Sequence, residues 1–191
     1  MNGEKRQKPT RRYATRSAKE CACIATFVAL LLAAQLLFST LPGVEAVTAL
    51  FVAYAFSFGV CRGVIAATAF SLLRQLLFGF FPTVLVLYLL YYNFLAVVFG
   101  LLGRRVKKPW KALVFSTALA CVCTVGFTML DNVVTPWFYA YSPEAARAYF
   151  FASLPFMATQ TVCVGVSNAV LFLPLWRAFR TIWRSLSTKN A

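Results

Sequence analysis

The sequence predicts an all-α membrane protein, a bundle of six transmembrane helices with both termini in the cytoplasm. Three observations predict this fold class. The 191-residue chain is 61% hydrophobic with a mean hydropathy of +0.73, whereas a soluble domain is about 45–50% apolar. Apolar stretches long enough to cross a bilayer alternate with short Pro, Gly or basic breaks. The basic residues, finally, gather on one side of the predicted membrane.

The breaks between the apolar stretches define the six spans in order. The first stretch follows a basic tail of residues 1–20 and is longer than the apolar core of a signal peptide, so we expect a retained helix. Pro42 ends this helix, Gly63 marks a tight turn into the third, and Pro82 begins the fourth. The predicted spans are residues 21–41, 44–60, 63–81, 82–103, 109–130 and 145–175, with a longer loop over residues 131–144.

The sixth span is longer than one crossing needs, so we expect it to tilt, and Pro155 or Pro174 would kink or end it. In residues 176–191, Trp and Phe interleave with arginines. This pattern fits either an interfacial helix on the cytoplasmic leaflet or simple anchoring of the last span. The chain thus divides into a basic cytoplasmic tail (1–20), a six-helix transmembrane domain (21–175) and a basic cytoplasmic or interfacial tail (176–191).

The positive charges test this arrangement independently of hydropathy. Of the 19 Lys and Arg residues, all but Arg74 and Arg147 lie in the two tails, beside the turn into the third span, or in the loop of residues 104–111. Six crossings place these segments on one side, and the positive-inside rule makes that side the cytoplasm. The net charge of +14 therefore indicates orientation in the plasma membrane. No nucleic-acid partner is expected, because no basic stripe lies on a polar domain.

The composition excludes several kinds of chemistry. The chain has no histidine and only five acidic residues, and it contains neither an intramembrane carboxylate pair nor a Walker motif. Its six cysteines show no Cys-x-x-Cys spacing, so we expect small buried apolar residues rather than metal ligands. We therefore predict no catalytic site, no metal site and no cofactor. A lipid-modifying membrane enzyme is the least favoured function class.

Arg74, in the third predicted span, is the most informative residue for function. A charged side chain within the bilayer costs about 2.5–3.5 kcal/mol on insertion scales, so it should face the bundle interior and find a partner. That partner is a carboxylate, a ligand, or both, and the available carboxylates on that side are Glu45, Asp131 and Glu144. Polar and aromatic residues of several spans share this half of the membrane and predict a small-molecule pocket. The candidate substrate-binding residues are Glu45, Arg74, Gln75, Tyr92, Asn93, Trp137 and Gln160.

Three alanines recur at every fourth position of the first span. Ala25, Ala29 and Ala33 therefore lie on one face of the helix. Small residues at this spacing let two helices approach closely in lipid. This face packs either against the protein's own helices or against a partner subunit.

Residues 41–104 contain a Pro-Gly turn followed by an acidic residue, a Gly-Val-x-Arg-Gly turn, the polar pair at Arg74 and Gln75, and a Gly-Arg exit from the fourth span. In these features the chain resembles the substrate-binding S components of energy-coupling factor (ECF) transporters. The resemblance implies that the domain of residues 21–175 captures a vitamin or related micronutrient from outside, beneath a lid of loops. It also implies that the alanine face docks on a transmembrane T component, whose ATPase subunits alone would use ATP.

The function predicted from the resemblance is therefore a membrane-embedded substrate-capture subunit of an ECF-type ABC importer. The alternative is a membrane structural or assembly protein that binds no solute. A small molecule that co-purifies with the chain would distinguish the two.

Overall fold

A computed structural model describes residues 18–38 and 45–188, and this part of the chain consists of six α-helices and short turns. Five of its helices are long and apolar enough to cross a bilayer, as expected of a multi-pass membrane protein, whereas α2 has only 13 residues. The helices are α1 (Ala18–Phe38), α2 (Ala46–Phe58), α3 (Val60–Phe78), α4 (Pro82–Arg105), α5 (Pro109–Phe138) and α6 (Pro143–Thr188).

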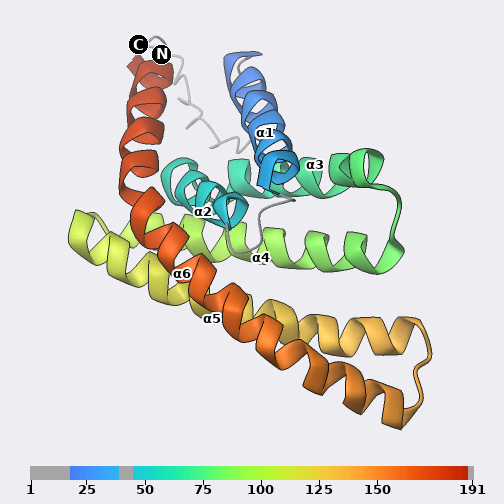
Figure 1. Ribbon diagram of the computed structural model, residues 1–191. Coiled ribbons are helices and arrows are strands. Elements are labelled where there is room, and N and C mark those ends of the chain that lie inside the picture. The colour runs from blue at the N-terminus through green and yellow to red at the C-terminus, as the bar shows by residue number, and fades with distance from the viewer. Residues whose placement is uncertain (1–17, 39–44, 189–191) are drawn as a thin grey trace, which may run out of the picture.

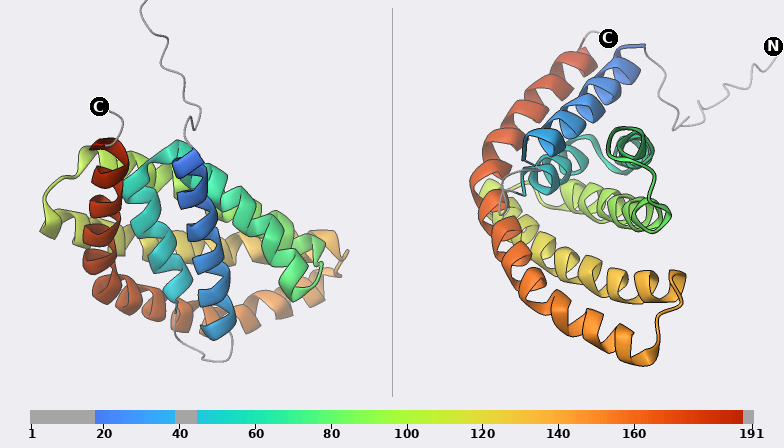
Figure 2. Two further views of the ribbon diagram at one scale, coloured as in Figure 1. Left: turned by 90° about the horizontal axis from the view of Figure 1, so that it is seen from above. Right: turned by 45° about the vertical axis from the view of Figure 1, so that its right-hand side comes forward.

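The helices form two hairpins that diverge from a shared base (Figures 1 and 2). One hairpin pairs α3 with α4 and the other pairs α5 with α6, while α2 packs on both α4 and α6. In Figure 2, left, the start of α1 and the end of α6 lie on the same side of the bundle. We call this the proximal side, and the opposite side, where α2, α4 and α6 begin, the distal side.

The short helix α2 is the centre of the core. Ten of its 13 residues are buried, because its neighbours surround it with aromatic rings. Tyr54 of α2 stacks on Phe27 of α1 at 3.7 Å between ring centroids, and the edge of Phe179 of α6 meets the same ring at 5.8 Å. Such ring pairs each add about 0.5–1.5 kcal/mol beyond area burial. They hold α1 and α6 to α2 on the proximal side.

A single glycine turns the chain from α2 into α3. Gly59 has φ 84° and serves both as the C-cap of α2 and as the N-cap of α3, a conformation that residues with a Cβ rarely adopt. The turn predicted at Gly63 is therefore misplaced, because α3 already begins at Val60. Arg62 in the first turn of α3 bonds Glu20 of α1 at 3.0 Å and lies 4.3 Å over the ring of Trp183 of α6.

The end of α4 packs backbone against backbone on this turn. A Cβ at Gly103 would lie 2.0 Å from the carbonyl oxygen of Phe56, and a Cβ at Gly100 would lie 2.6 Å from the amide nitrogen of Val60. Only glycine allows the α4 helix to approach this closely. These two contacts fix where α4 leaves the proximal side.

The long loop predicted over residues 131–144 is wrong. Helix α5 continues through Pro136 to Phe138, and only four residues separate it from α6. A Schellman motif ends α5, with Ala140 in the left-handed conformation at φ 49°. The backbone amide of Tyr141 donates to the carbonyl oxygen of Pro136 at 3.0 Å, and the backbone amide of Ala140 donates to the carbonyl oxygen of Trp137 at 3.4 Å. The turn between α5 and α6 is therefore compact and cannot form a large lid.

Helix α6 begins with strong local signals. The Ser142 hydroxyl accepts a hydrogen bond from the amide of Ala145 at 3.2 Å, Pro143 occupies the first helical position, and Glu144 lies in the first turn. The helix then runs for 46 residues, about 69 Å. Pro155 and Pro174 lie inside it, so neither ends it.

Candidate functional site

One set of polar side chains in the distal half comes from four helices and from the residue that precedes α2. That residue is a carboxylate that contacts α6, an arginine lies near the end of α3, and a phenol of α4 lies beside the arginine and accepts a hydrogen bond from an amide of α1. The residues concerned are Glu45, Gln160, Arg74, Gln35 and Tyr88. We call this set the distal polar cluster.

Glu45 and Gln160 are two predicted site residues that the fold brings into contact. The Gln160 amide donates to Glu45 Oε1 at 3.2 Å across 115 positions of sequence, and the Thr48 hydroxyl donates to Oε2 at 3.3 Å. Burial raises the pKa of Glu45, and the two hydrogen bonds oppose that shift. The Glu45 side chain is half-buried. Its two hydrogen-bond donors, Gln160 and Thr48, are both neutral.

A cavity of about 300 Å³ lies between α5 and α6 next to this contact, and Gln160 is part of its wall. Asp131 in the same wall accepts hydrogen bonds from the hydroxyls of Thr135 at 2.6 Å and Tyr149 at 2.7 Å. The cavity thus offers a polar rim with fixed acceptors and an apolar interior. Its lining residues are Phe127, Thr128, Asp131, Tyr149, Ala152, Ser153, Phe156 and Gln160.

Arg74 has no carboxylate partner among the described residues. Its guanidinium instead lies 4.4 Å from the ring of Tyr88 on α4 and 5.2 Å from the ring of Phe78, one turn further along α3. Cation–π contacts of this kind contribute about 0.5–2 kcal/mol. Arg74 Nε and Nη1 are buried without a hydrogen-bond partner. The alternative that Arg74 forms a structural pair with Glu45, Asp131 or Glu144 is therefore wrong.

Gln75 and Asn93 secure the α3–α4 hairpin. Gln75 is buried, and its Oε1 accepts a hydrogen bond from the amide of Phe81 at 3.1 Å, which braces the turn between the two helices. Asn93 Oδ1 accepts from the Thr68 hydroxyl at 3.3 Å, and its amide donates to the carbonyl of Leu89. Both side chains are thus engaged in the hairpin, although Gln75 Nε2 stays without a partner.

The remaining predicted site residues, Tyr92 and Trp137, lie in contrasting surroundings. Tyr92 is buried in an aromatic cluster, with ring centroids 5.1 Å from Phe51 and 5.3 Å from Tyr88. Trp137 lies in the last turn of α5 and is 81% exposed. Tyr92 thus borders the ring that covers Arg74, whereas Trp137 lies at the tip of the α5–α6 hairpin and outside the distal polar cluster.

Tyr88 belongs to this site although it is not among the predicted substrate-binding residues. Its ring covers Arg74, its hydroxyl accepts a hydrogen bond from the Gln35 amide at 3.4 Å, and its edge meets Phe127 in the cavity wall at 6.3 Å. The available signal was its position within a run of tyrosines in the fourth predicted span. That run did not reveal which ring faces the arginine.

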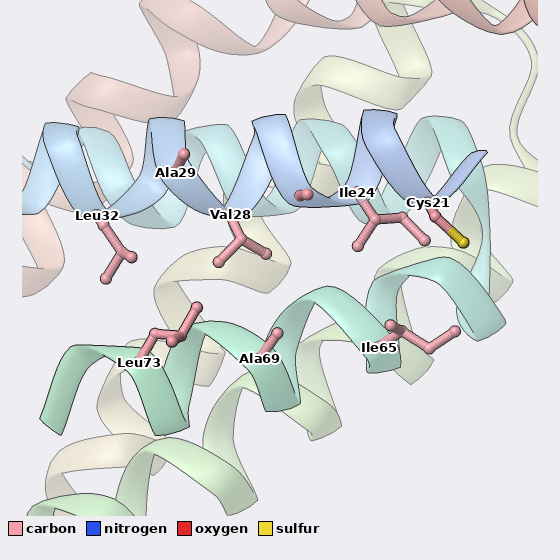
Figure 3. A pocket seen from close by; sticks show the side chains of 9 residues that line it. Cys21, Ile24, Val28, Ala29, Leu32, Ile65, Ala69 and Leu73 are labelled. Carbon is pink, nitrogen blue, oxygen red and sulfur yellow. The ribbon is translucent and has the colours of Figure 1, made fainter. Parts of the chain in front are cut away.

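The alanine face of α1 points away from the protein's own core. Ala25, Ala29 and Ala33 are exposed, so the alternative in which they pack internally is wrong. Ala25 and Ala29 line an apolar groove of about 340 Å³ between α1 and α3, whose opposite wall includes Ala69 and Leu73 (Figure 3). Small side chains on both walls leave this groove open.

The fold and the site define a class: a helical membrane bundle with a distal cavity that is mostly apolar and carries a few polar side chains, and without a cluster of metal-ligating side chains in the described residues. No protein-family model, curated protein or solved structure matches the chain.

Proposed function

We propose that this protein is the substrate-capture subunit, or S component, of an ECF-type ABC importer in the plasma membrane. The basic proximal side then faces the cytoplasm together with both termini, and the distal side faces outward. In this orientation the distal polar cluster and the α5–α6 cavity are the first parts of the bundle that a solute from outside meets. The solute would be a vitamin or a related micronutrient.

The contact between Glu45 and Gln160 beside the cavity carries this proposal. Burying a carboxylate in an apolar protein costs free energy that hydrogen bonds or an opposite charge must offset, and the present partners of Glu45 are two neutral donors. The adjoining cavity of about 300 Å³ is at the small end of the range for ligand pockets, about 300–1,000 Å³. A compact solute with hydrogen-bonding groups fits this combination of size and polarity.

The exposed alanine face supports docking on a T component, whose ATPases would drive uptake. Ala25, Ala29 and Ala33 form a surface without bulky side chains, which a second transmembrane helix can approach closely. The open groove beside it, between α1 and α3, gives that helix further room.

Ligand capture by the purified full-length chain tests the proposal. We expect small-molecule mass spectrometry to detect a released solute, and the same solute to raise the unfolding temperature of the protein. Glu45→Ala should weaken its binding, whereas Glu144→Ala, which changes an exposed carboxylate on the same side, should not. If no solute is released and no vitamin stabilises the protein, the chain is a structural or assembly protein instead.

A further inference from the structure

The guanidinium of Arg74 lacks the partner that its position demands. It lies four residues before the end of α3, about 6 Å below the distal end of that helix. Arginine stays charged in proteins, and a charged group at membrane depth is paired in nearly all cases. Two of its nitrogens, Nε and Nη1, nevertheless have no acceptor.

None of the four carboxylates in the described residues is paired with Arg74. Glu20 is bonded to Arg62, Glu45 to Gln160, and Asp131 to Tyr149 and Thr135. Glu144 is exposed in the first turn of α6. The fifth acidic residue, Glu4, lies in the basic tail outside the described residues, and residues 39–44 contain no acidic residue. None of the carboxylates in the described residues therefore serves as the acceptor for Arg74.

The Tyr88 side chain lies directly beside the unpaired guanidinium of Arg74. The Tyr88 ring covers the guanidinium, and a phenol can donate its own proton to a nearby oxygen. Gln35 binds the Tyr88 hydroxyl only through a long hydrogen bond of 3.4 Å, which gives little resistance to rearrangement. Since Nε and Nη1 are shielded in this state, an oxyanion reaches them when Tyr88 or the guanidinium changes rotamer.

From these contacts we infer that Arg74 binds the oxyanion of the captured solute, a carboxylate or a phosphate, and that Tyr88 closes over the pair. This inference rests on the proposed function and adds the chemical class of the substrate. The Tyr88 ring also packs on Phe127, a residue of the cavity wall, at 6.3 Å between ring centroids. The anion site and the cavity thus share one aromatic contact.

Matched pairs of probes test the charge requirement with the full-length chain in detergent. Each pair sets an acid against its neutral counterpart: nicotinate and nicotinamide, biotin and its amide, pantothenate and pantothenol. Inorganic phosphate is tested alone. The protein is the wild type, Arg74→Gln, Arg74→Lys, or the control Arg147→Gln, which removes an exposed arginine from the distal end of α6. Thermal shifts give the affinities, and size-exclusion chromatography checks that each variant is folded.

Binding of an acid or of phosphate, without binding of the neutral counterpart, supports the inference. Arg74→Gln should then raise the dissociation constant about 30-fold or more, because a buried charge loses its partner. Arg74→Lys should recover part of that loss, and Arg147→Gln should bind as the wild type does. Equal binding of acid and neutral probe, or unchanged affinity in Arg74→Gln, overturns the inference and leaves the proposed function standing.

Two further outcomes separate this inference from the proposed function. If no probe binds and the purified wild type releases no small molecule, solute capture fails and the inference fails with it. A second experiment tests whether a lipid headgroup supplies the oxyanion. It compares the unfolding temperature of the protein in nanodiscs of phosphatidylglycerol and in nanodiscs of phosphatidylcholine. Stabilisation by phosphatidylglycerol alone, lost in Arg74→Gln, would assign the oxyanion to a lipid headgroup and overturn its assignment to a solute.

Discussion

Replacing Gly103 by alanine tests the backbone contact that places α4 on the α2–α3 turn. The new Cβ would lie 2.0 Å from the carbonyl oxygen of Phe56, whereas Cβ contacts in proteins essentially never fall below 3.0 Å. The end of α4 must therefore move away by about 1 Å or more. Phe56 cannot give way easily, because its ring packs edge-on against Phe172 at 5.3 Å and Trp176 at 5.7 Å.

The expected cost of this displacement is at the upper end of the range for overpacking, about 3 kcal/mol. For a chain of this size, each kcal/mol lowers the unfolding temperature by about 2–4 °C. Gly103→Ala should therefore unfold roughly 6–12 °C below the wild type. Thermal unfolding of the purified chain in one detergent, followed by intrinsic fluorescence, measures this difference.

Gly126→Ala is the matched control, because a Cβ at Gly126 in α5 meets nothing within 4 Å. Alanine is favoured over glycine inside a helix by about 0.8–1 kcal/mol, so this variant should be as stable as the wild type or slightly more stable. Equal unfolding temperatures of Gly103→Ala and Gly126→Ala would show that α4 does not lie against Phe56.

Three further predictions follow from other contacts. Ala140→Gly should raise the unfolding temperature by about 2–4 °C, since φ 49° costs alanine about 1 kcal/mol that glycine avoids; a decrease would contradict the Schellman turn. Burial raises the pKa of Glu45, so the folded protein binds the proton of the Glu45 carboxyl more tightly than the unfolded chain does. The stability that this difference contributes is present at low pH and is lost as the pH rises through the folded-state pKa of Glu45. Glu45→Gln should therefore match the wild type near about pH 4 and unfold at a higher temperature near about pH 8, and a pH-independent difference would argue against burial. Asn168→Leu removes the hydrogen bonds that the buried Asn168 amide donates to Thr117 at 3.1 Å and to Ser116 at 3.4 Å. It should lower the free energy of unfolding by about 0.6 kcal/mol, and by at most about 1.7 kcal/mol. A larger loss in detergent titrations would show that these hydrogen bonds organise the α5–α6 hairpin.

Hydropathy and helix-start residues predicted most of the helices. Pro82 and Pro109 begin α4 and α5 as expected. The α5–α6 turn was missed because Pro136 and Pro143 were both interpreted as loop residues. Membrane helices tolerate proline when neighbouring groups satisfy the freed backbone. The sequence Ser142-Pro143-Glu144 did carry a helix-start signal, and it would have shortened the loop.

Side-chain partners were harder to predict than helices. Glu45 and Gln160 were both chosen as site residues, yet nothing in one sequence pairs positions 115 apart. Arg74 was expected to meet an acid or a ligand, and its observed neighbours are the rings of Tyr88 and Phe78. The rotation of each helix about its own axis decides such contacts, and that rotation depends on tertiary packing. The alanine face was an exception, because its four-residue spacing defines one face by itself.

The shortness of α2 has an electrical consequence. Its 13 residues extend about 20 Å, whereas the hydrocarbon layer is about 30 Å thick. Helix α2 alone therefore cannot span that layer, so at least one of its ends lies inside it, where its free amides or carbonyls need polar neighbours. If water reaches that end, the low-dielectric thickness along the axis of α2 is about 10 Å less than that of the surrounding hydrocarbon layer.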